Sequence, residues 1–210
     1  MRAKVDTAII AIAGGSGSGK TWLARQLRRR FAPYASILSL DDFYRDLSLV
    51  PSAERAQVNF DSPDAIEWPL FEKVLIAIRR GGSVLVPRYD FAIHTRAEGL
   101  RRWLPRPIVL VEGLWPWWQP GLARHYTLKV FRVDPEDIRL ARRTKRDTRQ
   151  RGRTGESVVM QWHDQVQPMY AKFVHPQLEA ADLMFGPRPT AAQIDKLADQ
   201  ILVRIHSCAA

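Results

Sequence analysis

Cysteine is almost absent from this sequence. Only one occurs among 210 residues, Cys208 near the C-terminus. A single thiol excludes an intramolecular disulfide and a metal site made of several cysteines. This usage is typical of reducing compartments, so we expect a cytoplasmic location.

Long hydrophobic runs are also missing. A membrane-spanning helix needs about 20 consecutive apolar residues, and the apolar stretches of this chain are far shorter. The first of them, 7–13, is followed by glycines and a lysine rather than by the small-residue cleavage site of a signal peptide. We therefore expect no leader and no membrane partner.

Acidic residues are fewer than basic ones. The chain has 22 Asp and Glu against 32 Lys and Arg, which gives a formal net charge of +10. Such a charge suits nucleic acids, but it suits the phosphates of a small nucleotide equally well. The densest cluster lies between 139 and 153, and no extended basic stripe occurs elsewhere. A nucleic-acid-binding ATPase is therefore a minor alternative, and we expect no nucleic-acid partner.

What the chain does contain is the pattern of one α/β domain, 1–210. Hydrophobic residues make up 46% of it, and its length is typical of a single domain. Apolar runs of strand length alternate with amphipathic stretches of helix length, which predicts a central parallel sheet covered by helices. The expected strands are 7–13, 35–40, 107–112, 127–133 and 182–185. The expected helices are 19–32, 64–80, 135–152, 155–174 with a kink at Pro168, and 190–206, with a β-hairpin at about 83–96.

A phosphate-binding loop is the strongest single signal. Residues 14–21 read Gly-Gly-Ser-Gly-Ser-Gly-Lys-Thr, which matches the P-loop pattern G-x-x-x-x-G-K-[ST] between an expected strand and an expected helix. Backbone N–H groups at such a helix N-terminus bind phosphate oxygens. We expect Lys20 to reach the β- and γ-phosphates and Thr21 to hold Mg²⁺. The residues expected to bind the nucleotide are Gly14, Gly15, Ser16, Gly17, Ser18, Gly19, Lys20 and Thr21.

Two acidic positions lie where strands of the expected sheet end. Glu112 ends the strand 107–112, and we expect it to hold the metal together with Thr21. Asp41 follows the strand 35–40 at the same edge, where ligands of such sheets bind. We expect Asp41 to orient an acceptor hydroxyl and accept its proton. The alternatives are an ordinary charge at a strand end for Glu112 and a helix cap for Asp41.

Arginines recur at helical spacing in the segment that precedes Gly152. They are Arg139, Arg142, Arg143, Arg146, Arg149 and Arg153, with Lys145 and Arg151 beside them. Such a run is often a solvated helix face. The glycine joint that follows favours a mobile lid at about 135–156, whose cations would close over phosphates.

Beyond the P-loop, short motifs follow one another through most of the chain. They are Asp-Asp-Phe-Tyr-Arg (41–45), Asn-Phe-Asp-Ser-Pro-Asp-Ala (59–65), Pro-Arg-Tyr-Asp-Phe (87–91), His-Thr-Arg (94–96), Glu-Gly (112–113), Arg-Arg (142–143), Arg-Asp (146–147) and Arg-Gly-Arg (151–153). With these motifs the chain resembles the uridine kinase (uridine-cytidine kinase) family of P-loop kinases. The resemblance implies a three-layer P-loop NTPase fold with a small nucleoside-binding β-hairpin and a helical lid. It also implies ATP-dependent phosphorylation of the 5′-hydroxyl of uridine or cytidine.

The resemblance further implies roles for single residues. The implied catalytic residues are Asp41, Lys20, Arg146 and Arg151, and the implied nucleoside-binding residues are Tyr44, Asp61, Tyr89, Phe91, His94, Arg143, Arg153 and Gln161. Among these, Asp61 matches the acid that holds the ribose hydroxyls, and His94 and the two hairpin aromatics match residues around a pyrimidine. ATP or GTP would be the donor, with Mg²⁺, and a small-molecule nucleoside the acceptor. Related enzymes form oligomers, so a homo-oligomer is a further expectation.

Two segments depart from the pattern of that family. The segment 185–189, Phe-Gly-Pro-Arg-Pro, differs from the usual sequence near the adenine and leaves the donor base open. The segment 115–118, Trp-Pro-Trp-Trp, is unusually aromatic and indicates either core or interface packing or an altered acceptor pocket. A kinase for another small hydroxylated metabolite, such as nicotinamide riboside, phosphoribulose or pantothenate, is therefore the main alternative.

Overall fold

The computed structural model describes residues 7–55 and 57–209, except for the side chains of 208 and 209. The first six residues, on which the expectation of no leader partly rests, and the thiol of Cys208 lie outside the described residues. Within the described part of the chain, no helix is both long enough and apolar enough to span a membrane.

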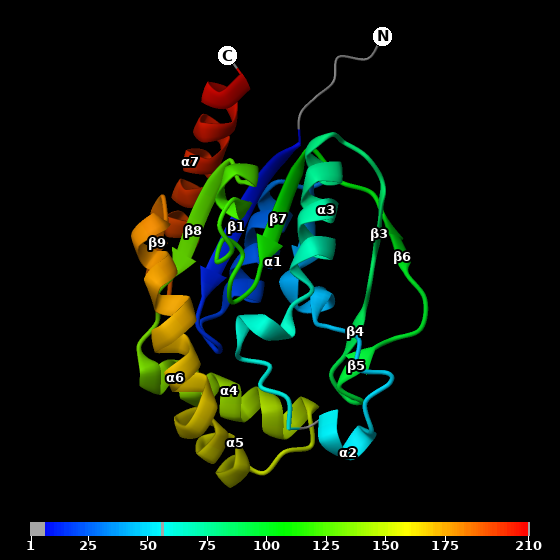
Figure 1. Cartoon of the computed structure of the whole chain (residues 1–210). Coiled ribbons are helices and arrows are strands. Elements are labelled where there is room, and N and C mark those ends of the chain that lie inside the picture. The colour runs from blue at the N-terminus through cyan, green and yellow to red at the C-terminus, as the bar shows by residue number, and fades with distance from the viewer. Residues whose placement is uncertain (1–6, 56, 210) are drawn as a thin grey trace.

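A five-stranded parallel sheet forms the centre of the molecule (Figure 1). Its strands lie in the order β2-β7-β1-β8-β9, and every neighbouring pair runs parallel. All residues of β1 are buried, as in parallel sheets covered on both faces. The predicted parallel sheet is confirmed. Its strands are β1 (Ala8–Gly14), β2 (Ala35–Ser39), β7 (Ile108–Glu112), β8 (Leu128–Arg132) and β9 (Leu183–Phe185).

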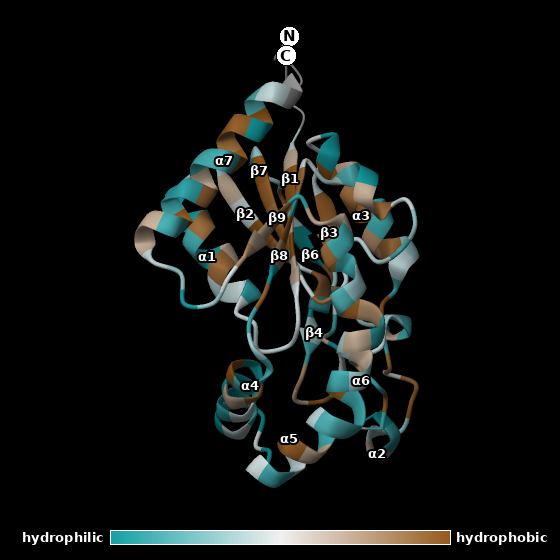
Figure 2. Cartoon of the chain, turned by 90° about the vertical axis from the view of Figure 1, so that its left-hand side faces the viewer, coloured by the Kyte–Doolittle hydropathy of each residue, from teal (hydrophilic) through white to brown (hydrophobic). Residues whose placement is uncertain are grey.

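Helices cover both faces of this sheet and complete the three layers (Figure 2). Successive residues of a strand point to opposite faces, so Ile10 and Ile12 pack in one buried cluster and Ile9 and Ala11 in the other. The first cluster includes apolar side chains of α1 and α7, and the second includes those of α3. The bounds of these helices are α1 (Lys20–Arg30), α7 (Ala191–Ala209) and α3 (Trp68–Arg79).

The hairpin beside the sheet consists of two short antiparallel ladders. Its outer part, β4 (Tyr89–Asp90) with β5 (Thr95–Arg96), lies where the sequence predicted a hairpin. An inner part pairs β3 (Val84–Val86) with β6 (Arg101–Trp103), so paired strands continue beyond residue 96. Pro87 separates the two ladders, as expected of a residue that has no N–H to donate.

The helix predicted over 64–80 begins later than expected. Residues Pro63–Ala65 form a single 3₁₀ turn, and the Ser62 side chain accepts a hydrogen bond from the N–H of Asp64. Ile66 then pairs as an isolated bridge with Tyr44. The α-helix begins only at Trp68, where proline in the first turn suits a helix start. The prediction was wrong for 64–67 because a tertiary β-bridge overrides the local helical pattern there.

The helix predicted over 155–174 is longer and less regular than expected. It consists of α5 (Gly155–Gln161), a π-helical stretch (Trp162–Val166), α6 (Gln167–Met169), a second π-helical stretch (Tyr170–Val174) and a 3₁₀ stretch (His175–Ala180). Pro168, the expected kink, lies between the two π-helical stretches. Such wide turns occur where the regular hydrogen-bond ladder is interrupted.

The tryptophan-rich segment packs into the core. The side chains of Trp115 and Trp117 are 1% and 6% exposed and belong to the same cluster as α3. The indole N–H of Trp117 donates to the carbonyl of Gln177 at 3.1 Å. Trp118 packs edge-on against Phe173, with ring centroids 5.1 Å apart. Core packing, one of the two alternatives for this segment, is therefore what the structure shows.

The remaining helical segments gather mainly at the carboxyl ends of the strands, at the bottom of Figure 1. The predicted lid contains α4, and α5 packs against it. The bounds are a 3₁₀ turn at Leu40–Phe43, α2 (Ser52–Arg55), a 3₁₀ turn at Leu122–His125 and α4 (Glu136–Gln150).

Candidate active site

A cleft of about 530 Å³ opens where β1, β2 and β7 end. The P-loop forms its floor, the hairpin and the segment around Asp61 form one wall, and α4 with α5 forms the other. Segments that are far apart in the sequence thus meet at one edge of the sheet, where ligands bind in open α/β folds.

The P-loop has the shape that phosphate binding requires. Gly19 precedes the first turn of α1 in the left-handed conformation, and Gly17 has a φ of +77°. A Cβ at Gly17 would overlap the backbone carbonyl oxygen of Arg139 in α4. Only glycine fits this position, because it has no Cβ and adopts a positive φ without strain. This cradle fits a polyphosphate.

Lys20 is the buried cation of this loop. Its Nζ donates to the carbonyl oxygen of Gly15 at 2.9 Å. Burial lowers the pKa of Lys20 to about 8, while the carboxylates of Glu112 and Asp41 oppose the shift. A phosphate anion beside Nζ would favour the charged form.

Glu112 and Thr21 place a carboxylate and a hydroxyl side by side beneath the loop. The Thr21 hydroxyl donates to Glu112 Oε2 at 3.0 Å, and the Ser39 hydroxyl donates to Oε1 at 2.9 Å. Burial raises the pKa of Glu112, and the nearby Asp41 carboxylate adds to this shift. Hydroxyl and carboxylate oxygens are the ligands that Mg²⁺ prefers, and Mg²⁺ commonly completes its shell with phosphates and water. This donor set therefore fits Mg²⁺.

Asp41 lies in the cleft directly after β2. Its N–H is hydrogen-bonded to the Ser39 hydroxyl at 3.3 Å, so Ser39 rather than Asp41 caps the 3₁₀ turn that follows. The Asp41 carboxyl is therefore not used as a cap. Burial raises its pKa, and the cations of Lys20, Arg151 and Arg146 oppose the shift.

Aromatic side chains line the hairpin side of the cleft. Tyr44 packs against Tyr89 with ring centroids 5.0 Å apart, and Phe60 stacks on His94 at 5.4 Å with nearly parallel rings. The hydroxyl of Tyr89 is buried and has no hydrogen-bond partner among the described residues. Burial lowers the pKa of His94, and two arginines of the lid add to this shift. The pocket thus offers flat apolar faces, a free hydroxyl and a neutral imidazole.

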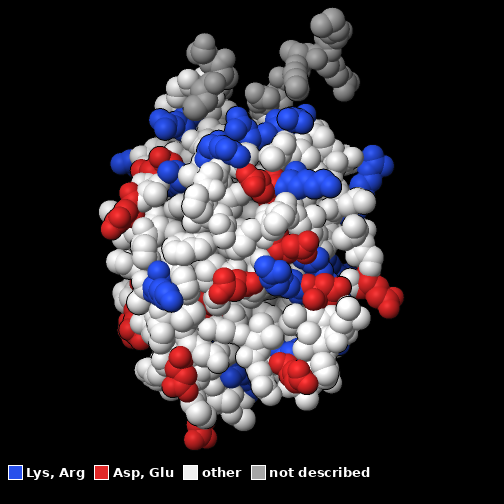
Figure 3. All heavy atoms as spheres, viewed as in Figure 1, with Lys and Arg blue, Asp and Glu red and all other residues white. Residues whose placement is uncertain are grey.

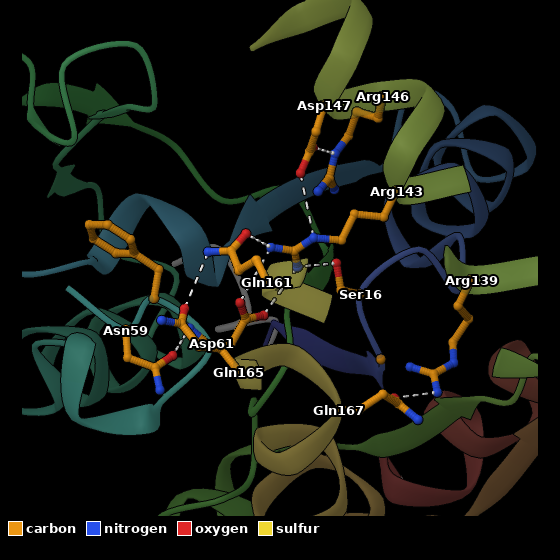
Figure 4. Close-up of polar contacts among 12 residues, drawn as sticks. Ser16, Asn59, Asp61, Arg139, Arg143, Arg146, Asp147, Gln161, Gln165 and Gln167 are labelled. Carbon is orange, nitrogen blue, oxygen red and sulfur yellow. Dashed lines mark hydrogen bonds and ion pairs between the residues drawn. The ribbon is translucent and has the colours of Figure 1, made fainter. Parts of the chain in front are cut away.

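Arg143 binds Asp61 at the centre of the cleft (Figure 4). Both side chains are buried. Nη1 and Nη2 of Arg143 donate to the two carboxylate oxygens of Asp61 at 3.3 and 3.4 Å. Arg143 also donates to the Gln161 side chain at 3.0 Å, and Gln161 accepts a further bond from Arg153. This bidentate pairing fixes the Asp61 carboxylate in the cleft.

Asp147 organises the arginines of the lid. It is buried in α4 and lies 2.7 Å from Arg146, 3.4 Å from Arg143 and 3.7 Å from Arg151. Although burial raises its pKa, these arginines hold the pKa of Asp147 below the usual value. Arg151 also lies over the ring of Phe91, 4.5 Å from its centroid. The lid therefore contacts the hairpin across the cleft.

The basic helix is not simply a solvated face. Arg139 points away from the cleft into a buried site, where its guanidinium lies over the rings of Tyr170 and Trp162 at 4.0 and 5.2 Å. Arg142 instead links the lid to the P-loop, since it donates to Gly17 O at 3.3 Å. On the face shown in Figure 3, acidic side chains lie beside a few basic ones at the end that carries α4 and α5. Burial and pairing, rather than solvation, thus explain much of this cluster.

Comparison with known families decides the classification. The model of the phosphoribulokinase/uridine kinase family matches residues 9–193. The chain belongs to this family. The resemblance found in the sequence motifs is thereby confirmed.

Relatives in this family are similar along their whole length. A uridine kinase of Chloroflexus aggregans is 40% identical over 205 residues, with 96% of this chain and 97% of the relative covered. A uridine kinase of Deinococcus deserti is 36% identical and covers 99% of both chains.

Solved structures share the fold at lower identity. The putative fructose transport system kinase from Silicibacter sp. TM1040 superposes with a TM-score of 0.70 at 20% identity, covering 88% of this chain and 92% of that one. The phosphoribulokinase from Rhodobacter spheroides gives a TM-score of 0.65 at 20% identity, covering 87% and 70%. The predicted P-loop fold is confirmed.

The structure brings most of the predicted site residues of this family member to one cleft. Lining it are Ser16, Gly17, Gly19, Lys20, Thr21, Asp41, Tyr44, Asp61, Tyr89, Phe91, His94, Glu112, Arg143, Arg146, Arg151, Arg153 and Gln161. Gly14, Gly15 and Ser18 are buried in the loop and do not line the cleft. The chemical role of each residue stays a prediction.

Several residues of the site were not predicted from the sequence. Phe60, Leu114, Trp22, Arg25, Ala92 and Gln150 also line the cleft, as does Arg142, which the sequence predicted only as one of the lid cations. Phe60 lies in the motif Asn-Phe-Asp beside Asp61, so its motif could have indicated it. Ser39 could have been found as the last residue of the strand before Asp41. The sequence offered no comparable signal for Trp22 and Gln150.

Proposed function

We propose that this kinase transfers the γ-phosphate of ATP to the 5′-hydroxyl of a pyrimidine nucleoside, uridine or cytidine. The observation that carries the proposal is the buried Asp61 carboxylate, held by Arg143 between the aromatic pocket and the P-loop. A carboxylate in this place can accept hydrogen bonds from the two ribose hydroxyls. Relatives similar over their full length bear the name uridine kinase, which supports this acceptor.

On the donor side, the P-loop would hold the triphosphate. Its N–H groups and the α1 N-terminus bind phosphate oxygens, and Lys20 exchanges its bond with Gly15 O for a bond to phosphate. Thr21 and Glu112 would hold Mg²⁺, which neutralises charge on the transferred group. No group of three or more His, Cys, Asp or Glu that could hold a metal is found among the described residues. The phosphates would therefore supply further ligands.

On the acceptor side, the hairpin would bind the base. Tyr44, Phe60 and Phe91 offer aromatic surfaces, and the free Tyr89 hydroxyl can bond to a base carbonyl or ring nitrogen. A buried hydroxyl left without a partner costs about 1–3 kcal/mol, so a ligand that satisfies it gains affinity. Neutral His94 can donate or accept one hydrogen bond.

During transfer, Asp41 would orient the 5′-hydroxyl toward the γ-phosphorus. The hydroxyl oxygen bonds to phosphorus, the bond to the bridging oxygen of ADP breaks, and the hydroxyl proton passes to Asp41. Arg146 and Arg151 would stabilise charge on the phosphoryl oxygens. A raised pKa suits Asp41 as a base better than the ordinary value near 4 would.

The test is ADP release from Mg-ATP with a panel of acceptors. We expect turnover with uridine and cytidine. Adenosine, nicotinamide riboside, pantothenate, ribulose 5-phosphate and single-stranded DNA should give none. Turnover with another member of the panel and not with pyrimidine nucleosides would overturn the acceptor while leaving the kinase assignment intact. A cytoplasmic location and a homo-oligomer remain further parts of this proposal, tested by fractionation and by light scattering.

Replacing His94 by alanine should raise the KM for uridine about tenfold or more, because a hydrogen bond and a stacked ring are lost. The KM for ATP should change little, since His94 lies on the hairpin away from the P-loop. Steady-state kinetics with each substrate varied in turn measures both constants. His163→Ala, at an exposed position outside the cleft, is the matched control. An equal rise in both KM values for His94→Ala would refute the assigned pocket.

A further inference from the structure

Arg143 contacts both the donor side and the acceptor side of the cleft (Figure 4). Its Nη1 donates to the hydroxyl of Ser16 in the P-loop at 2.9 Å and to Asp61 at 3.3 Å. Its Nη2 donates to Asp61 at 3.4 Å and to Gln161 at 3.0 Å. One buried guanidinium group thus joins the phosphate loop to the carboxylate assigned to the acceptor.

We propose that the bond between Ser16 and Arg143 couples the two substrate sites, so that a bound nucleotide tightens the binding of the nucleoside. Ser16 and Arg143 act as positioning residues in this role. The inference rests on the proposed function, because it takes Asp61 as the group that binds the ribose of the acceptor.

The coupling begins at the turn that holds Lys20. In the structure Lys20 Nζ donates to the carbonyl of Gly15, the residue before Ser16. A triphosphate that binds Lys20 would replace its bond to the Gly15 carbonyl. The phosphates would also bind the N–H groups of the same turn and so order Gly15 and Ser16. The Gly15 backbone is closely packed, because a Cβ at this position would lie 2.5 Å from the guanidinium of Arg139 and 2.9 Å from the ring of Tyr170. When phosphate orders Gly15 and Ser16, the Ser16 hydroxyl is fixed as well, and Arg143 donates a hydrogen bond to this hydroxyl.

The orientation of Arg143 in turn affects Asp61. Its Nη1 is shared between the Ser16 hydroxyl and Asp61 Oδ1, so the plane of the guanidinium depends on both partners. With Ser16 fixed by the donor, Arg143 is already oriented toward the carboxylate, and the nucleoside has less ordering to supply. By linkage, the nucleoside must tighten the binding of the nucleotide by the same factor.

Calorimetric titration of uridine measures the coupling directly. The dissociation constant is determined for the protein alone and with saturating β,γ-imido-ATP and Mg²⁺, and the ratio of the two constants is the coupling factor. We expect a factor of about 5 or more for the native chain and below about 2 for Ser16→Ala. Because the factor is a ratio within one variant, a general loss of affinity for either ligand cancels.

The matched control is Ser18→Ala in the same loop. The Ser18 hydroxyl is also buried, but it has no hydrogen-bond partner among the described residues. We expect this variant to keep the factor of the native chain. A native factor near 1, or equal factors for the native chain and Ser16→Ala, would overturn the coupling while leaving the acceptor assignment standing. Absence of uridine binding to the native chain would instead overturn the acceptor itself, and the coupling with it.

Discussion

Replacing Asp41 by asparagine is expected to lower kcat about a thousandfold, within the usual range for the loss of a positioned base. Asparagine has nearly the same shape, so the cleft and the Ser39 bond to the backbone N–H should persist. The amide cannot accept the proton of the acceptor hydroxyl. Binding of ATP should persist because the P-loop is untouched. Single-turnover transfer and titration with β,γ-imido-ATP measure the two quantities separately.

Asp42→Asn is the matched control for this substitution. Asp42 is the next residue, but it does not line the cleft, and its carboxylate lies 3.7 Å from Arg101 of the hairpin. We expect its kcat to stay near that of the native enzyme. Turnover of Asp41→Asn equal to that of Asp42→Asn would remove Asp41 from its assigned role.

The same assignment predicts the acid side of the pH profile. Transfer needs the ionised Asp41, and burial raises the pKa of this carboxyl in the folded protein. As the pH falls, Asp41 therefore gains its proton at a higher pH than an ordinary aspartate, whose pKa is near 4. Activity should be full well above the raised pKa and should fall as the pH drops through it. A kcat that stays constant down to about pH 4 would contradict this role.

The second large effect is expected for Gly17→Ala. A Cβ at this position would overlap the carbonyl oxygen of Arg139, and that atom belongs to the backbone of α4. Either the P-loop or the lid helix must therefore shift, and a displacement of about 1 Å in a catalytic site can cost about a hundredfold. We expect kcat/KM for ATP to fall at least by about this factor. Kinetics with ATP varied, and titration with β,γ-imido-ATP, measure the loss.

Gly81→Ala is the control that distinguishes the steric overlap at Gly17 from the strain of a positive φ. Gly81 follows α3 with a φ of +69°, close to that of Gly17, and a Cβ there would meet nothing within 4 Å. In both variants a non-glycine residue adopts the left-handed conformation, which lowers stability by about 1–2 kcal/mol. Only Gly17→Ala should lose affinity for ATP. Equal ATP affinities for the two variants, both shown to be folded by circular dichroism, would contradict the packing argument.

The fold and the position of the proposed donor site followed from local patterns in the sequence. The strand before Gly14, the glycine loop and the helix after Lys20 are contiguous, so their geometry depends on neighbours in the chain. The same holds for Glu112 and Asp41, because the carboxyl ends of parallel strands share one edge of the sheet. For these residues, the place in the strand–loop–helix pattern of the sequence is enough to predict where they lie in the fold.

The helix boundaries show where local patterns fail. The segment 64–67 has helical spacing of apolar residues, yet Ile66 pairs with Tyr44, which is distant in the sequence. The π-helical stretches on both sides of Pro168 place Trp162 and Tyr170 against the guanidinium of Arg139 in α4. These features depend on contacts between distant segments, which a pattern within one segment does not contain.

The sequence by itself predicted a nucleotide site at residues 14–21 and showed that the motifs of this chain belong together in one kinase family. Only the tertiary structure decided what each arginine of the basic helix does. Arg139 lies between aromatic rings, Arg143 joins Ser16 to Asp61, and Arg146 pairs with Asp147. All three recur at helical spacing, so the sequence pattern alone cannot distinguish their environments. Which one meets the P-loop, the acceptor pocket or the core depends on how α4 is rotated against the rest of the fold, and only packing sets that rotation.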